Sequence, residues 1–503
     1  MTDTSYYPSA FPVKDDHRRP RTLVLCFDGT ANEFSKRNTN VVKLYSILKK
    51  DSPKSQLCYY QERIGTYFQP GVVSPLFRFA ARTLDVMFAW YLSEHIMDGY
   101  TFLMQNYHEG DSVCIFGFSR GAYTARALAG MLHKVGLLSK DNHEQVSFAY
   151  KLYKSSSHKN NKLAVQFKKS FSREVPIEFL GVWDSVASVG IVSGRTLPFV
   201  GTNSTVKWFR QALSLDERRA KFRPNLYHRH RTVVDSNPKL SPTSSESPAR
   251  RFMAHVRAFT FPMGPTLRDT PNNLRDNSWH DRDFGNTSES DGIVTRVLEV
   301  WFAGAHSDVG GGVAKDSKPH ALSNISLRWM VREILKTRCH ILFDKAALEL
   351  WGIPIAMIKQ AEHARTPDSG QQTPAMPATP DIYAVPLAPG AGTDVSIPDG
   401  DDLTPPPSAS ESLDALDAAE KISDQLKKSV FWWVLEILPT YSVWQNEKDE
   451  WVGRWSFKWG RGRTVPSQPR PLFHESVRTR IKNLSVDYLP RVRFERGIEE
   501  YVV

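Results

Sequence analysis

Residues 112–135 read SVCIFGFSRGAYTARALAGMLHKV, an apolar run followed by a glycine-flanked serine and a helical pattern. Ser112–Phe116 predicts a buried strand, and Arg120–Val135 has the Ala and Leu content of a helix. Between them, Gly117-Phe118-Ser119-Arg120-Gly121 has the form Gly-x-Ser-x-Gly. A serine on a sharp strand-to-helix turn is presented to a base, as a weak hydroxyl nucleophile requires. We therefore predict that Ser119 is a nucleophile supported by Gly117 and Gly121; the alternative is that it only caps the helix.

Strand-like and helix-like patterns alternate along most of the chain. The first helix is expected to be capped by Asn38 or Asn40. Alternating strands and helices predict an α/β fold with a mostly parallel sheet, helices on both faces and inserted cap or loop segments. The Gly-x-Ser-x-Gly turn within it indicates the α/β-hydrolase type. The further predicted strands are Thr22–Phe27, Gln56–Gln61, Glu178–Val182 and Val297–Phe302, and the further helices are Asn40–Leu48, residues 82–107 and Leu322–Leu335.

Two of these strands run into residues that a serine nucleophile needs. One leads through Trp183 into Asp184, and another leads into His306. An imidazole can take the serine proton, and a carboxylate can fix the imidazole tautomer and stabilise its cation. The order Ser119, Asp184, His306 is that of α/β-hydrolases. The alternative for Asp184 is a turn cap, and weaker candidates for the base are His133, His255 and His474.

Asp308 competes with Asp184 because it lies two residues after the predicted base. A carboxylate so close in sequence would struggle to reach the far nitrogen of the His306 ring. We therefore interpret Asp308 as a supporting residue that organises the glycine-rich loop by accepting hydrogen bonds from backbone amides.

The first predicted strand ends in Cys26-Phe27-Asp28-Gly29-Thr30. This resembles half of the Asp-x-Asp-Gly-Thr motif of aspartate-nucleophile phosphatases, but the nucleophilic position is Cys26, which excludes that chemistry. In a hydrolase sheet the same loop would supply an oxyanion-hole N–H from Gly29 or Thr30, opposite the Arg120 N–H, with Asp28 in support. We expect no metal and no cofactor.

Changes in composition along the chain predict how it divides into an arm, a catalytic domain, a linker and a C-terminal segment. We expect a flexible arm at 1–20 and a catalytic domain at 21–360 whose insertion, about 205–295, contains a helix over Ala212–Phe222. Residues 361–415 read as a disordered linker. The aromatic, basic segment 416–503 is either a membrane-interface face or a helix and a hairpin docked on the catalytic domain.

Bulk properties narrow the class of protein. The net charge of +11 favours anionic surfaces such as phospholipid headgroups, although it also serves ordinary solubility. No zinc-finger or RNA-binding pattern supports nucleic acid as a partner. The four dispersed cysteines, the polar N-terminus and the lack of a long apolar run predict a cytoplasmic protein, with peripheral membrane contact left open. The oligomeric state is not predicted.

Taken together, these residues resemble the phospholipase-effector-like α/β-hydrolases related to the catalytic domain of type VI secretion lipases. The resemblance covers roughly residues 21–355, with a fragment near 473–481. It implies a catalytic Ser119, Asp184 and His306, and an ester-hydrolysing activity that some relatives direct at phospholipids. The matching blocks are LCFDGTANEF, GFSRGAYTARALAGML, FLGVWDSVASVG, ALSLDERRAKF, VWFAGAHSDVGGG, ISLRWMVREIL and FHESVRTRI.

The leading hypothesis is a serine hydrolase that cleaves carboxylic esters, phospholipids among them, through an acyl-enzyme. One alternative is a catalytically weak protein that binds lipid or membrane surfaces, and another is an acyltransferase using the same triad. The side chains of Arg120 and Arg126 either favour an anionic substrate or are only solvated or paired.

Overall fold

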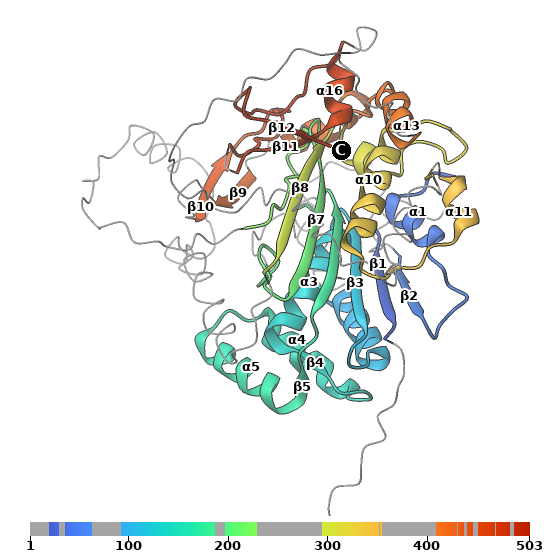
Figure 1. The fold of residues 1–503 in the computed structure, drawn as a ribbon. Coiled ribbons are helices and arrows are strands. Elements are labelled where there is room, and N and C mark those ends of the chain that lie inside the picture. The colour runs from blue at the N-terminus through green and yellow to red at the C-terminus, as the bar shows by residue number, and fades with distance from the viewer. Residues whose placement is uncertain are drawn as a thin grey trace, which may run out of the picture.

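A computed structural model shows the fold, and the elements below lie within the part of the chain that it describes (Figure 1). The described residues are 20–29, 36–62, 92–186, 197–228, 294–351, 353–354, 409–429, 431–436, 440–445, 451–467, 469–482 and 487–503. The predicted N-terminal arm up to residue 19 and the predicted linker from 361 to 408 lie outside them.

The centre of the molecule is an eight-stranded sheet in the order β12-β11-β8-β7-β6-β3-β1-β2. Every neighbouring pair in it is parallel. The predicted parallel sheet is therefore confirmed. Its strands are β1 (Thr22–Phe27), β2 (Gln56–Gln61), β3 (Ser112–Phe118), β6 (Ile177–Trp183), β7 (Val206–Ser214), β8 (Arg296–Phe302), β11 (Leu472–His474) and β12 (Glu500–Val502).

Helices cover both faces of this sheet (Figure 1). Side chains of a strand alternate between its faces, so a strand covered on both sides reads as a continuous apolar run. In β1, Leu23 and Leu25 pack into one hydrophobic core and Val24 and Cys26 into the other. The first core includes a helix at 92–106, α3 (Arg120–Val135), α4 (His143–Lys154) and α5 (His158–Phe171). The second includes α1 (Asn40–Ile47), α10 (Leu322–Thr337), α11 (Lys345–Leu350) and α13 (Ala409–Ala418).

Most predicted elements occur where the sequence placed them, with small extensions. The bounds of β1, β2 and α3 agree with the prediction, and β3, β6, β8 and α10 are one or two residues longer. The predicted cap of α1 was wrong. Thr39, not Asn38 or Asn40, is its N-cap, and the Thr39 hydroxyl accepts the Val42 N–H at 3.3 Å.

The predicted helix over Ala212–Phe222 is wrong. Residues up to Ser214 belong to β7, where Ala212 pairs with Val300 of β8. Ala212 packs into one core, whereas Leu213 and Leu215 join a third cluster with Trp301, so the chain alternates as a strand. The first part of the predicted insertion, residues 205–228, therefore contains a central strand and its following loop, while 229–293 lie outside the described residues.

The C-terminal segment contributes directly to the sheet. β11 pairs with β8, and β12 pairs with β11. α13 begins at Ala409, inside the range predicted as linker, so that end of the linker is helical. The predicted helix and hairpin are present as α15 (Phe431–Glu436) and the antiparallel pair β9 (Thr440–Gln445) and β10 (Trp451–Ser456). The chain thus returns, after the segment outside the described residues, to complete its own sheet (Figure 1).

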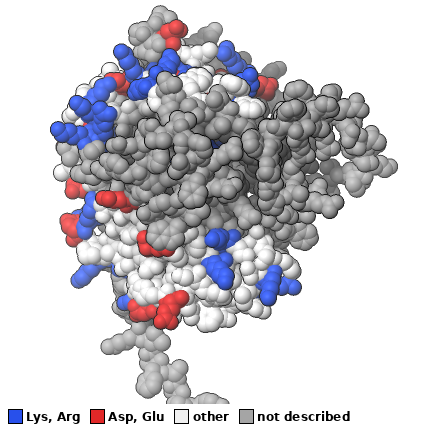
Figure 2. All heavy atoms as spheres, turned by 180° about the vertical axis from the view of Figure 1, so that it is seen from behind, with Lys and Arg blue, Asp and Glu red and all other residues white. Residues whose placement is uncertain are grey.

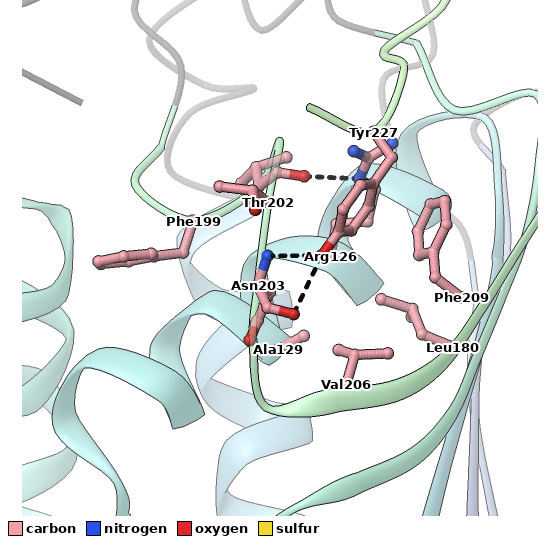
Figure 3. Close-up of a pocket in the computed structure, with 10 residues that line it drawn as sticks. Arg126, Ala129, Leu180, Phe199, Thr202, Asn203, Val206, Phe209 and Tyr227 are labelled. Carbon is pink, nitrogen blue, oxygen red and sulfur yellow. Dashed lines mark hydrogen bonds between the residues drawn. The ribbon is translucent and has the colours of Figure 1, made fainter. Parts of the chain in front are cut away.

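Arg126 fastens α3 to the loops that flank β7 (Figure 3). Its side chain is buried and donates to the carbonyl oxygens of Val200 at 2.6 Å and Leu226 at 3.1 Å, and to Gln211 Oε1 at 3.1 Å. Burial lowers the pKa of Arg126 to about 10, so the guanidinium stays charged at neutral pH. The neighbouring cavity of about 10 Å³ has room for about one water. Arg126 is therefore a structural residue, and the idea that it receives an anionic substrate is wrong.

Replacing Arg126 with methionine should lower the free energy of unfolding by about 3 kcal/mol or more, because several buried carbonyl groups lose their donor. Urea denaturation followed by circular dichroism would measure this. The matched control is Arg470→Met, which removes a 71% exposed side chain from a surface ion pair and should cost about 1 kcal/mol or less. Equal losses in the two variants would contradict the assigned role.

Candidate active site

Ser119 lies on a strained turn between β3 and α3. Its φ of 58° and ψ of −118° are unusual for a residue other than glycine. The turn needs glycine on both sides: a Cβ on Gly117 would lie 2.5 Å from the Gly121 oxygen, and one on Gly121 would lie 2.2 Å from the Phe27 oxygen. The Ser119 N–H donates to the Trp183 carbonyl at 3.0 Å, which ties the turn to the end of β6. This backbone holds the serine at the edge of the sheet.

The three predicted residues follow strands that end at one edge. β3 leads into Ser119, β6 into Asp184 and β8 into the loop before His306. The register aligns these ends, because Phe118 pairs with Trp183 and Ser214 of β7 pairs with Phe302. Parallel strands place their carboxyl ends together, and ligand sites of open α/β sheets lie there. The topology therefore brings residues far apart in sequence to one place.

The side chains of Ser119, His306 and Asp184 form a continuous hydrogen-bonded chain. His306 Nε2 lies 2.8 Å from Ser119 Oγ, and His306 Nδ1 lies 2.5 Å from Asp184 Oδ2. The network assigns the Nδ1–H as donor to the carboxylate and leaves Nε2 to accept from the serine hydroxyl. Each of the three residues is at most 5% exposed, so water does not compete strongly for these bonds.

Asp184 has further partners, and one of them was not predicted. The Ser214 N–H donates to its Oδ1 at 3.0 Å, and the Ser214 hydroxyl lies 3.2 Å from its Oδ2. Arg463 of the C-terminal segment donates through Nη1 to Oδ1 at 2.5 Å and through Nη2 to Oδ2 at 2.9 Å. Burial raises the pKa of Asp184, but the Arg463 charge and the His306 hydrogen bond outweigh it and hold this pKa well below its usual range. Asp184 is therefore ionised.

His306 is the first residue of the short helix α9 (His306–Gly310) and sits between aromatic rings. The Phe118 ring lies 4.7 Å from the imidazole centroid, and Phe222 meets it edge-on at 4.8 Å. Glu217 accepts the His306 backbone N–H at 3.2 Å and also pairs with Arg219. Burial lowers the pKa of His306 more than Asp184 raises it. The imidazole is therefore neutral at physiological pH, as a general base must be.

Asp308 lies within α9 and does not contact the imidazole in any hydrogen bond of the described residues. Its Oδ2 accepts the Ala305 N–H at 2.9 Å and the Ser423 N–H at 2.8 Å. Burial raises the pKa of Asp308 to about 6. The carboxyl thus joins the loop before His306 to the C-terminal segment.

The loop after β1 also lies beside the serine. A Cβ on Gly29 would be 3.2 Å from Ser119 Cβ. However, the Gly29 N–H donates to Asp28 Oδ1 at 2.7 Å, which competes with the predicted oxyanion role of Gly29. Asp28 Oδ1 also accepts from the Thr39 hydroxyl at 2.7 Å. Thr30 lies outside the described residues.

The other candidates are placed elsewhere or not described. His474 is buried on β11, where it stacks on Phe302 and contacts Ser476. His255 lies outside the described residues. Within the part of the chain that the structure describes, no three His, Cys, Asp or Glu side chains gather as a metal site would require. No helix of that part is both long and apolar enough to cross a membrane.

Comparisons with known proteins show which family this chain resembles over most of its length. A model of the family described as "T6SS, Phospholipase effector Tle1-like, catalytic domain" matches residues 21–333. An uncharacterized protein of Saccharomyces cerevisiae is 30% identical over 557 residues, an alignment that covers 92% of this chain and 79% of that protein.

Two solved structures are weakly similar, each at 16% identity. An uncharacterized protein from Pseudomonas aeruginosa has a TM-score of 0.32, with 69% of this chain and 51% of that chain covered. The Tle1 effector bound to the VgrG spike of the type 6 secretion system has a TM-score of 0.27, with 60% and 53% covered. The chain spans about half the length of both. The match over residues 21–333 covers more than half of the chain, and it shows that this protein belongs to the Tle1-like phospholipase effector family, whose name indicates hydrolysis of the lipase or phospholipase type.

Proposed function

We propose that this protein is a serine hydrolase that cleaves carboxylic esters of phospholipids through an acyl-enzyme. The observation that carries the proposal is the chain of contacts from Ser119 Oγ to His306 Nε2 at 2.8 Å and from His306 Nδ1 to Asp184 Oδ2 at 2.5 Å. Family membership supports a lipid as the substrate.

In the proposed reaction His306 takes the Ser119 proton as Ser119 Oγ attacks the ester carbonyl carbon. The tetrahedral intermediate collapses when His306 returns the proton to the leaving alcohol, and the acyl group stays on Ser119. Water then attacks the acyl-enzyme with His306 again as base, which releases the fatty acid and restores the serine. Asp184 stabilises the imidazolium formed in each half and is not protonated itself.

The oxyanion is proposed to bind at the start of α3. The first N–H groups of a helix have no acceptor inside the helix, and the helix dipole favours negative charge there. The Arg120 N–H is therefore the first donor. The second would come from the loop after β1, where the Gly29 N–H is held by Asp28 and Thr30 is the remaining candidate. Asp28 would shape this loop, and Thr39 and Tyr60 hold its carboxylate.

Ser119→Ala should lower kcat/KM for p-nitrophenyl esters and phospholipids by several orders of magnitude and abolish fluorophosphonate labelling, because the nucleophile is removed. The control Ser139→Ala changes an exposed serine and should behave as wild type. Undiminished labelling of Ser119→Ala would refute the scheme. Product analysis with added alcohol distinguishes hydrolysis from acyl transfer, since a transferase would form a new ester in place of free fatty acid.

The acid limb of the pH profile should report His306. The base works only when neutral, so kcat/KM falls as pH drops through its pKa, which burial places below the ordinary 6.5. Phe222→Ala exposes one side of the imidazole and should move this limb upward, whereas Phe222→Leu should move it less. Kinetics with a soluble ester between pH 4 and 9 would measure both. A limb unmoved by Phe222→Ala would contradict the burial argument.

We also propose that the protein contacts anionic membrane surfaces through an aromatic patch of Trp433, Phe457 and Trp459. These side chains are 39%, 50% and 56% exposed. The residue next to Trp433 in α15, Trp432, packs on Phe222, which packs on His306, so α15 carries both a patch residue and a contact to the site. Aromatic rings suit the headgroup region, and the neighbouring Lys427 and Lys428 are exposed. Figure 2 shows Lys and Arg at several places on the face seen from behind, with Asp and Glu among them.

Replacing Phe457 and Trp459 together with alanine should weaken co-sedimentation with vesicles of phosphatidylserine and phosphatidylcholine by roughly tenfold or more, since each ring loses apolar burial. The control Phe171→Ala removes a 51% exposed ring from α5 and should bind as wild type. Ser119→Ala should also bind as wild type, which separates attachment from turnover. Equal binding by the double variant and wild type would exclude the patch.

A further inference from the structure

We propose that Arg463 is a positioning residue of the active site, so that the C-terminal segment completes the catalytic machinery. This inference rests on the proposed serine-hydrolase function. It starts from the bidentate contact of the Arg463 guanidinium with both oxygens of Asp184, at 2.5 Å and 2.9 Å. A planar guanidinium that meets both oxygens of a carboxylate fixes its position and its orientation.

The Arg463 side chain is buried and makes several hydrogen bonds besides those to Asp184. Its side chain is 2% exposed. Nη1 donates to the Ser214 hydroxyl at 2.7 Å and to the Ser214 carbonyl at 3.1 Å, while Nε donates to the Phe222 carbonyl at 3.1 Å and Nη2 to the same oxygen at 2.6 Å. The same guanidinium therefore fastens Asp184 and the residue whose ring covers His306. Two of the residues that contact the imidazole, Asp184 and Phe222, are therefore hydrogen-bonded to Arg463.

The backbone around Arg463 is fastened independently of the side chain. The Arg493 N–H donates to the Arg463 carbonyl at 2.8 Å, and the Val465 N–H donates to the Arg493 carbonyl at 3.0 Å. Gly462 allows this approach, since a Cβ there would lie 1.9 Å from the Arg491 oxygen. Val465 packs into the cluster that contains Leu213. The segment thus has its own anchors, and the guanidinium is not needed merely to attach it.

Charge gives Arg463 an effect on His306 beyond geometry. The charged groups facing the imidazole are Asp184, which follows β6, and Glu217 and Arg219 from the loop after β7. Arg463 acts on the imidazole through Asp184. Asp184 attracts a proton to His306, and Arg463 partly neutralises that carboxylate. Removing the Arg463 charge leaves a more negative potential at the imidazole, so the pKa of His306 should rise. A residue that only filled space would not move it.

The test compares Arg463→Gln, Arg463→Lys and the control Arg470→Gln, which removes one positive charge from a 71% exposed side chain of the same segment. Arg463→Gln should lower kcat by about 10- to 100-fold, as is typical when the hydrogen-bond partner that orients a metal-ligating side chain is removed. KM should change little, because Arg463 does not contact substrate. The acid limb of the pH profile should move upward. Arg463→Lys keeps the positive charge but loses the bidentate contact. Its acid limb should therefore stay near that of wild type, and its kcat should fall less than that of Arg463→Gln.

The decisive readout does not require turnover. NMR titration of isotope-labelled imidazole rings, with the His306 signal assigned from His306→Gln, gives the His306 pKa in each variant, and circular dichroism shows that the variants are folded. A raised His306 pKa in Arg463→Gln, but not in Arg463→Lys or Arg470→Gln, supports the proposal. Unchanged His306 pKa and kcat in a folded Arg463→Gln overturn it. If wild type lacks Ser119-dependent labelling, the proposed hydrolase function fails, whereas the pKa comparison still decides the role of Arg463.

Discussion

Asp184 keeps its charge at a position with no exposure to solvent, and the arrangement of the site depends on how that charge is balanced. An isolated carboxylate buried in a protein is costly and tends to take up a proton. Here the carboxylate accepts hydrogen bonds from His306, Ser214 and Arg463. These donors come from different parts of the chain, so the charge can be buried only when the whole fold has formed.

The parallel sheet makes this convergence possible. β3, β6, β7 and β8 are neighbours in the sheet, and Ser119, Asp184 and His306 follow three of them. Gly121 lets α3 approach the end of β1, and Gly117 leaves room for the start of α3 beside β3, so Ser119 can take its strained conformation. Such strain persists only where the surroundings over-determine it, and the Ser119 N–H bond to Trp183 together with the packing of α3 provides this.

The C-terminal segment contributes to both the sheet and the contacts around Asp184. β11 and β12 extend the sheet past β8, Ser423 binds Asp308, and Arg463 reaches Asp184. Its compositional contrast with the preceding linker range suggested a segment docked on a finished domain. The contacts show instead that the sheet and the site both include it. The family match ends at residue 333, so Ser423 and Arg463, which contact Asp308 and Asp184, lie beyond it.

The sequence by itself determined the α/β class, most strand and helix positions, and the order of the serine, the acid and the histidine. These signals are local: a strand buried on both faces is a continuous apolar run, and the glycine-flanked serine needs only its two neighbouring elements. The prediction of a helix over Ala212–Phe222 was wrong because apolar spacing alone does not separate a short helix from a buried strand. Pairing with β8 makes the first residues of this range a strand. Several adjacent polar residues could have capped α1. Thr39 is the cap because its hydroxyl donates to Asp28 and accepts the Val42 N–H, and the contact with Asp28 exists only in the folded chain. Arg463, one of many arginines in a basic tail, acquires its meaning only from a carboxylate 279 residues away, and no local pattern records such a pairing.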